Sequence, residues 1–214
     1  MSTIKLIITY LLAYLVGSIP TAVWTGKLFH NIDVREHGSG NAGATNAIRV
    51  LGWKTGIPVL IVDILKGWVA TMLPHFLNLA EPGSASLVNL QIIAGLFAIA
   101  GHIFPVFADF RGGKGVATAG GVLLAIDPLL TLSCLGVFLI VMIISGYVSL
   151  SSICAGLAFP AFLFIFFNTP SLFFRIFSVF IAVALIFTHR KNISRIFKGE
   201  ESKLFGKGKK QKSV

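Results

Sequence analysis

The segment from residue 38 to residue 49 combines glycines with side chains that bind anions. It reads Gly-Ser-Gly-Asn-Ala-Gly-Ala-Thr-Asn-Ala-Ile-Arg. Glycines let backbone N–H groups approach an anion, and hydroxyl and amide groups add donors. The closing arginine can hold a phosphate with two parallel hydrogen bonds. The segment predicts a phosphate-binding loop, with a merely flexible glycine-rich loop as the alternative. Its candidate residues are Ser39, Gly40, Asn41, Thr45, Asn46 and Arg49.

The same segment contains the pattern Gly-x-Gly-x-x-Gly, which is typical of dinucleotide-binding folds. Such a site needs the pattern between a strand and a helix of a βαβ unit. Here the segments on both sides are apolar enough to be membrane helices. We therefore expect no nucleotide and no other cofactor.

A second glycine-rich segment, residues 110–118, reads Phe-Arg-Gly-Gly-Lys-Gly-Val-Ala-Thr and opens into an apolar run. It is not a Walker A loop, because glycine follows the lysine where Ser or Thr is needed. A glycine turn at a helix N-terminus still suits a phosphate, since unpaired N–H groups and the helix dipole face the anion. The alternative is an interfacial turn whose lysine reaches to the lipid surface. The candidate residues are Gly112, Gly113, Lys114 and Gly115.

Two weaker candidates follow later in the chain. Ser149 lies between two apolar runs, where serine also commonly caps a helix. His189 and Asn192 follow the last apolar run, and a spacing of three predicts that both lie on one helical face. A terminal basic run can equally complement the helix dipole or anchor the chain on lipid.

The elements that must position these residues are membrane helices. The chain has 214 residues, a mean hydropathy of +0.86 and only 12% charged residues, a combination rare in soluble domains. We predict an all-α integral membrane protein with seven transmembrane helices. The fourth is short and could be tilted or half-inserted, in which case Ser149 would move to the opposite face. The expected spans are 4–25, 55–76, 90–107, 114–127, 129–146, 153–168 and 172–188.

The distribution of lysine and arginine predicts the orientation, because cytoplasmic loops are enriched in both. Of the 18 such residues, 15 fall after the first span, after the third span or after His189, on one side. The N-terminus is therefore expected outside, and the C-terminus and all candidate segments in the cytoplasm. We divide the chain into a membrane domain, 1–196, and a basic tail, 197–214. The tail favours anionic lipid over nucleic acid as the partner of the +10 net charge.

Three of the ionisable residues inside or at the end of the spans bear on the fold. Asp63 and Lys66 lie in the second span, where charges are costly and usually paired. Their spacing of three permits an ion pair, and we favour this structural role over a catalytic one. His102 is expected to shape the following loop or to be a buried hydrogen-bonding group.

The quoted strings resemble the PlsY-type, acyl-phosphate-dependent glycerol 3-phosphate acyltransferases of bacteria. The similarity covers nearly the whole chain, including Asp-Ile-Leu-Lys-Gly at 63–67 and residues 101–118. It implies a seven-helix enzyme of the inner membrane that moves a fatty acyl group from acyl phosphate to the 1-hydroxyl of glycerol 3-phosphate. The products are lysophosphatidate and phosphate, in the first acylation of bacterial phospholipid synthesis. It also implies functional coupling to an enzyme that forms acyl phosphate.

The resemblance also implies roles for residues at the motif positions. Ser39, Arg49, Lys114 and His189 are predicted to be catalytic, with Ser149, Asn192 and the other loop residues binding substrate. Acyl phosphate is a mixed anhydride with a good leaving group, so we expect positioning and charge neutralisation to dominate. No His-x-x-x-x-Asp pair is present. The hydroxyl proton would pass to a substrate phosphate oxygen or to His189.

Two other functions were weighed. A transporter for an anionic phosphorylated solute would place polar residues at the membrane midplane on several helices, but only Asp63 and Lys66 are available. An alcohol phosphotransferase would need an acidic cluster for divalent metals. The eight acidic residues are scattered, so no metal site is predicted.

Overall fold

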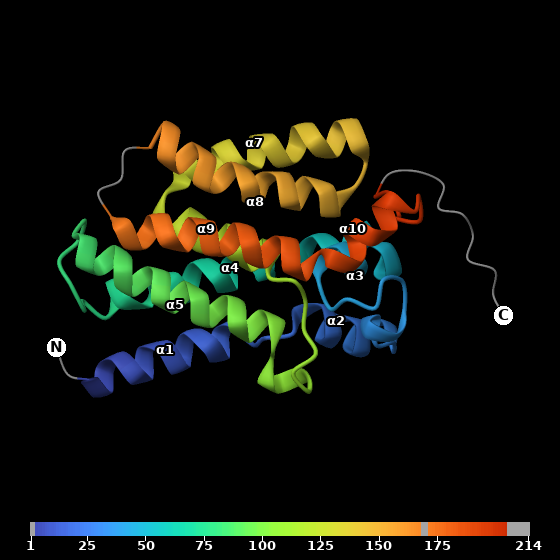
Figure 1. Cartoon of the computed structure of the whole chain (residues 1–214). Coiled ribbons are helices and arrows are strands. Elements are labelled where there is room, and N and C mark those ends of the chain that lie inside the picture. Colours follow the sequence, from blue (N-terminus) through green and yellow to red (C-terminus); the bar gives the residue numbers. More distant parts are fainter. Residues whose placement is uncertain (1–2, 168–170, 205–214) are drawn as a thin grey trace. The chain divides into compact units, whose positions relative to one another are not determined.

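The computed structural model describes residues 3–167 and 171–204, and within them every regular element is a helix (Figure 1). The chain divides into two compact units, Met1–Thr131 and Leu132–Val214. Four helices are long and apolar enough to cross a membrane, or six if each of two bent helix pairs is one span. The all-helical membrane fold expected from the sequence is confirmed.

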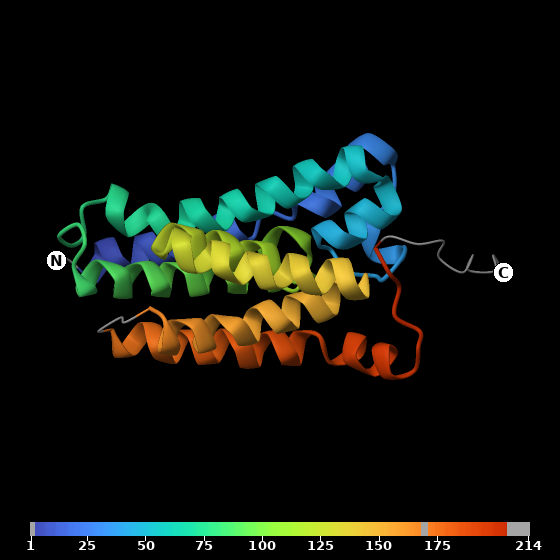
Figure 2. The same cartoon turned by 90° about the horizontal axis from the view of Figure 1, so that it is seen from above.

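Unit 1 is built around one long helix, α4, which packs against α1, α3, α5 and α6. The chain direction alternates between neighbouring helices, so the segments before α4 and before α6 lie at the same end of the unit (Figure 2). The elements are α1 (Thr3–Gly17), α2 (Thr21–His30), η1 (Val34–Glu36), α3 (Ala44–Leu51), α4 (Trp53–Phe76), α5 (Ala85–Ile103), η2 (Val106–Ala108) and α6 (Val116–Ile126).

The first predicted span is broken rather than continuous. α1 ends at Gly17 and α2 begins at Thr21, with a bend of 41° between them. Pro20 lies in the break, where it offers no N–H to a helical ladder. As a result α2 continues to His30, five residues beyond the predicted end.

The third span is shifted toward the N-terminus relative to the prediction of 90–107. α5 begins at Ala85 because the Ser84 hydroxyl accepts a hydrogen bond from Leu87 N at 3.1 Å and caps the helix. It ends at Ile103, shortly before Pro105.

The fourth predicted span, 114–127, corresponds to a helix that is too short to qualify as a full span. α6 has 11 residues, bounded by Gly115 at a φ of 79° and by Asp127-Pro128. Asp127 then caps the next helix, with Oδ1 accepting from Leu130 N at 2.9 Å. The length alone separates α6 from the helices that qualify as full spans.

Helices α4 and α6 touch through small residues. A Cβ at Gly121 would collide with the Ile64 carbonyl, and one at Gly67 would collide with the Thr118 carbonyl. Small residues at such positions let membrane helices approach closely, which increases van der Waals contact. Gly120, one residue earlier, faces open space, with nothing within 4 Å of an added Cβ.

Gly121→Ala is expected to destabilise the protein, whereas Gly120→Ala should not. Overpacking a tight contact costs about 1–3 kcal/mol, and here the obstacle is rigid backbone. Thermal unfolding in detergent, followed by loss of the monodisperse chromatographic peak, measures both. Equal midpoints for the two variants would contradict the close contact of α4 with α6.

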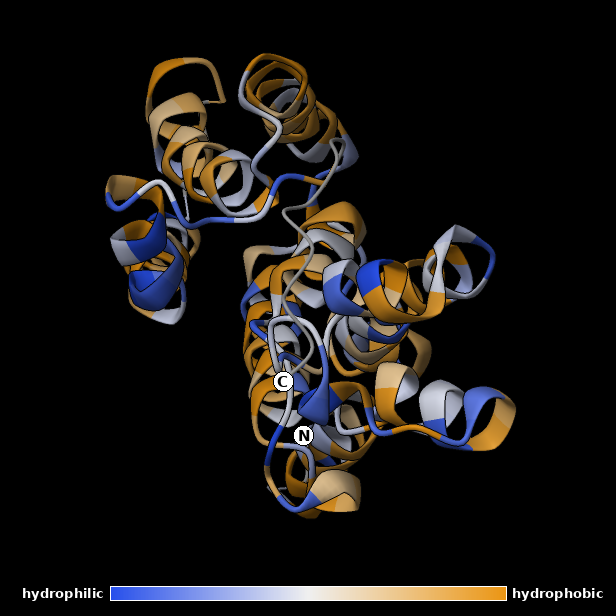
Figure 3. Ribbon diagram, turned by 90° about the vertical axis from the view of Figure 1, so that its right-hand side faces the viewer, coloured by the Kyte–Doolittle hydropathy of each residue, from blue (hydrophilic) through white to orange (hydrophobic). Residues whose placement is uncertain are grey.

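The described residues of unit 2 form four helices, of which α7 starts in the last residues of unit 1. They are α7 (Pro128–Ser145), α8 (Val148–Ile165), α9 (Leu172–Thr188) and α10 (Arg190–Phe197). α8 packs against α9 through Phe159, whose ring lies 5.8 Å from that of Phe174 and 6.0 Å from that of Phe177. Figure 3 views the molecule along its long helices, and hydrophilic residues are visible on the short helices and loops at the end that faces the viewer.

Candidate active site

The first glycine loop, residues 37–43, is shaped by the buried amide of Asn46. Its Oδ1 accepts from Ser39 N at 2.8 Å and from Ser39 Oγ at 3.1 Å. Its Nδ2 donates to the carbonyls of Val34 at 2.7 Å and His37 at 3.1 Å. Gly38 turns with a φ of 61°, and a Cβ there would collide with Asn46 Oδ1. Asn46 is 1% exposed, so its place in this structure is inside the loop, holding Ser39.

The other candidates of this segment line the loop and the following helix. Ser39 and Gly40 are exposed at the loop tip, and Asn41 is half-buried. Thr45 lies in the first turn of α3, and Arg49 is exposed in its last turn. The binding of phosphate by the glycine loop together with Arg49 stays a prediction.

The second glycine loop follows η2 and ends where α6 begins. The amides of Gly112 and Gly113 donate to the carbonyls of Ile103 and His102, both at 3.1 Å, which ties the loop to the end of α5. These two amides are thus engaged by the protein. Of the other predicted residues, Lys114 is half-buried, and Gly115 directly precedes the first turn of α6, where helix amides lack partners within the helix.

Arg35, in η1, links the segments that precede the two glycine loops, and it is not among the residues predicted from the sequence. Its Nη1 donates to the Ala108 carbonyl at 2.8 Å and lies 3.7 Å from Asp109 Oδ2. Its Nε and Nη2 bind the Asp33 carboxylate, the latter at 2.7 Å. The ring of Trp24 on α2 also lies 6.2 Å from that of Phe107. Within unit 1 these contacts join α2 and η1 to η2, so the segments that precede the two predicted phosphate loops lie together at one end.

The Asp33–Arg35 pair is strongly coupled electrostatically. Hydrogen bonds from Arg35 hold the pKa of Asp33 well below its usual range, although burial acts in the opposite direction. Hydrogen bonding to Asp33 raises the pKa of Arg35 in turn. Both side chains are largely buried, with 12% and 8% exposure, so the pair is shielded from solvent.

Asp33→Asn is expected to lower the free energy of unfolding at neutral pH by about 1–3 kcal/mol, the usual range for a hydrogen-bonded charged group. Because the folded-state pKa is depressed, this contribution is fully present above the unfolded value of about 4 and is lost as the pH falls below it. Thermal midpoints of wild type and variant should therefore converge between about pH 4 and pH 2. Glu36→Gln, an exposed change in the same loop, is the control. A gap between wild type and Asp33→Asn that widened toward acid would contradict this assignment.

Unit 2 gathers its candidate residues around Glu201, which was also not singled out. Ser149 Oγ and Asn192 Nδ2 each donate to Glu201 Oε1 at 2.7 Å. Arg195 Nε donates to Oε2, also at 2.7 Å. Burial acts to raise the pKa of Glu201, but the hydrogen bonds from Arg195, Asn192 and Ser149 together lower it. The prediction that Ser149 lies between helices is wrong, because it is buried in the first turn of α8.

His189 lies at the 56° bend between α9 and α10, and it is 3% exposed. Its Nδ1 lies 2.9 Å from the Leu185 carbonyl. A carbonyl oxygen only accepts, so Nδ1 carries the proton in this contact, and in the neutral ring Nε2 is the acceptor. Asn192 is also buried, three residues further on.

Residues 197–204 are part of unit 2 rather than a separate tail. Besides Glu201, Leu204 N donates to the Gly146 carbonyl at 3.0 Å, and Lys203 Nζ lies 5.5 Å from the centre of the Tyr147 ring. The rest of the predicted basic tail, 205–214, lies outside the described residues.

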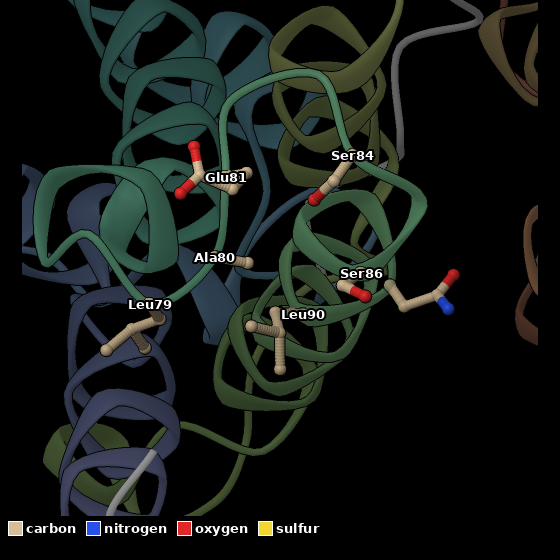
Figure 4. A pocket seen from close by; sticks show the side chains of 7 residues that line it. Leu79, Ala80, Glu81, Ser84, Ser86 and Leu90 are labelled. Carbon is tan, nitrogen blue, oxygen red and sulfur yellow. The ribbon is translucent and has the colours of Figure 1, made fainter.

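A shallow hollow lies at the turn between α4 and α5, at the opposite end of unit 1 from the glycine loops (Figure 4). Its lining includes Glu81 and polar uncharged side chains, and no lysine or arginine. It does not suit a phosphorylated substrate. The lining residues are Leu79, Ala80, Glu81, Ser84, Ser86, Asn89 and Leu90.

Comparisons with known proteins agree with one another. The family model described as glycerol-3-phosphate acyltransferase matches residues 7–199. Curated proteins of that name are 45% identical in Chlorobaculum tepidum, covering 91% of this chain and 95% of the relative, and 49% identical in Listeria monocytogenes, covering 94% and 98%.

A solved structure gives the same result. The glycerol 3-phosphate form of PlsY (YgiH), described as an integral membrane glycerol 3-phosphate acyltransferase, superposes with a TM-score of 0.83 at 36% identity, over 94% of this chain and 96% of that one. The alternatives of a transporter and a phosphotransferase gain no support. By sequence and by fold, the chain belongs to the glycerol-3-phosphate acyltransferase family and is an integral membrane acyltransferase.

Proposed function

We propose that this acyltransferase takes its acyl group from acyl phosphate and transfers it to the 1-hydroxyl of glycerol 3-phosphate. The observation that supports this most directly is the hydrogen bond from Arg35 to the Ala108 carbonyl, which brings the segments before the two glycine loops together at one end of unit 1. Arg49 lies in α3, which follows the first loop, and Lys114 lies in the second loop. Two loops and two cations are more than one phosphate group requires. They suit a reaction in which both substrates carry phosphate.

In the proposed reaction the 1-hydroxyl oxygen attacks the carbonyl carbon of acyl phosphate. The carbon–oxygen bond to phosphate then breaks, and inorganic phosphate leaves with the electron pair. Lys114, Arg49 and Ser39 neutralise and orient the phosphate groups, which supplies positioning and electrostatic stabilisation. The hydroxyl proton passes to His189 Nε2 or to a phosphate oxygen of the substrate. Ser149 and Asn192 contribute to substrate binding, with Glu201 holding both side chains in place.

The proposed site faces the cytoplasm of a bacterial inner membrane. This orientation rests on the excess of lysine and arginine in the segments after α2, before α6 and after α9. It needs seven crossings, with α6 as the short fourth, the N-terminus outside and the C-terminus inside. Labelling of single cysteines at Ser39 and Lys114 in intact cells tests it. Reaction of either position with an impermeant reagent from outside would overturn the topology.

The donor is tested with purified protein in detergent. Incubation with acyl phosphate and glycerol 3-phosphate should release phosphate and form 1-acylglycerol 3-phosphate in equal amounts. With acyl-CoA or acylated acyl carrier protein as the donor, no 1-acylglycerol 3-phosphate should form. Turnover with acyl-CoA alone would overturn the donor assignment. The donor also implies a functional partner, an enzyme that forms acyl phosphate.

A further inference from the structure

A buried ion pair lies on α4 beneath the loop end of unit 1. Asp63 and Lys66 are 1% and 5% exposed, and Lys66 Nζ lies 2.8 Å from Asp63 Oδ1. The pair expected from their spacing is confirmed. Desolvating two charges is costly, and well-packed apolar side chains often give equal or greater stability. The contacts of Asp63 and Lys66 point to a role for the pair other than stabilisation.

Both members of the pair hold the break between α1 and α2. Lys66 Nζ donates to the Ile19 carbonyl in the break at 2.8 Å, and that carbonyl also accepts from Thr21 N at 3.0 Å. Thr21 Oγ1, at the start of α2, donates to Asp63 Oδ1 at 3.2 Å. The pair thus holds the start of α2, and α2 is followed by η1 and then by the first glycine loop.

The same carboxylate faces a histidine that supports the second glycine loop. His102 is 6% exposed, and its Nδ1 lies 3.8 Å from Asp63 Oδ1. Its carbonyl accepts from Gly113 N, and a Cβ at Gly113 would collide with His102 Nε2. The ring is therefore packed against the loop backbone one residue before Lys114.

We propose that Asp63, with Lys66 and His102, is a positioning residue for glycerol 3-phosphate. The cluster joins the start of α2 to the underside of the second glycine loop, and so sets the spacing of the two phosphate loops from within the membrane. Arg35 links the segments that precede the same two loops. None of the three residues touches the reacting atoms in this assignment, which rests on the proposed site at the two loops.

The test uses the full chain with both charges removed together. Asp63→Asn alone would leave a buried lysine without its partner and could unfold the protein. The double variant Asp63→Asn/Lys66→Met leaves no buried charge unpaired, so it should fold, with a thermal midpoint close to that of wild type. We expect its KM for glycerol 3-phosphate to rise about tenfold with kcat changed less than about threefold, a loss of substrate binding rather than of chemistry.

His102→Ala provides the independent arm of the test. It should raise KM for glycerol 3-phosphate to a similar extent, and adding it to the double variant should change KM little further, because both act through one loop. Gln91→Leu is the matched control, since Gln91 is a buried polar residue of α5 bonded to Met72, remote from the loops. It should leave both kinetic constants unchanged.

The outcomes separate this proposal from the proposed function. If wild type fails to turn over acyl phosphate and glycerol 3-phosphate, the proposed function fails. If wild type is active and the folded double variant keeps the wild-type KM, the positioning role is refuted. If the KM effects of the double variant and of His102→Ala multiply fully, the cluster does not act as one unit, and the proposal is again refuted.

Discussion

Lys114→Met is expected to reduce kcat/KM for both substrates by roughly 10²–10³-fold, the range observed when a preorganised electrostatic group is removed from an active site. Lys114 lies between the tied part of the second glycine loop and the first turn of α6. We expect its ammonium group to place a full positive charge, rather than the partial charge of an amide, next to the leaving phosphate. Steady-state phosphate release, with each substrate varied in turn, measures the effect.

Lys54→Met is the control for Lys114→Met. Lys54 is exposed in the first turn of α4, at the same end of unit 1, so its removal changes the net charge near the loops equally. It should alter kcat/KM less than about twofold, since exposed charges act weakly through screened solvent. Equal losses in the two variants would mean that general attraction, not a bound phosphate, explains the effect.

The second large effect is expected from His189→Ala, which should lower kcat by roughly 10²–10⁴-fold with little change in KM if the imidazole takes the hydroxyl proton. The contact with the Leu185 carbonyl places the ring proton on Nδ1, so Nε2 of the neutral ring can accept. The acidic limb of the kcat profile should disappear in the variant, because that limb reports the base.

An effect of His189→Ala mainly on KM rather than on kcat would assign His189 a different role. A raised KM for glycerol 3-phosphate, with kcat kept within about tenfold and the pH profile retained, would leave His189 as a phosphate ligand and the proton to a substrate oxygen. His75→Ala is the control, because His75 lies at the far end of α4 beside Phe76. It should leave the rate unchanged.

Much of the fold and the loop positions could be predicted because both are local properties of the chain. Long apolar runs identified the spanning helices, and glycines between them identified the loops. The break at Pro20 was missed because proline is tolerated in membrane helices where neighbouring groups satisfy the freed carbonyl. Here that carbonyl is the one of Val16, which accepts from Ile19 N at 3.3 Å. The starts of α5 and α8 depend on caps and packing that hydropathy does not report.

The residues that hold the site together were harder to find. Arg35 contacts a carbonyl 73 positions away, and Glu201 contacts a serine 52 positions away. A single arginine or glutamate in a charged segment resembles any solvated side chain until the chain is folded. The sequence identified Asn46 as a candidate, but it could not predict that the amide of Asn46 faces into the loop. Gly38 and Gly40 both have a positive φ, 61° and 71°, so the local sign of this tight turn in the sequence is its pair of glycines.

The 11 residues of α6 also bear on where the two reactants meet. At 1.5 Å per residue such a helix extends about 16 Å, roughly half the thickness of the hydrocarbon layer. If α6 is the fourth crossing, as we propose, the bilayer beside it becomes thinner or one end of the helix lies below the headgroups. Either arrangement would let glycerol 3-phosphate from the water and the proposed acyl phosphate from the lipid react at a common depth, without either substrate leaving its preferred phase.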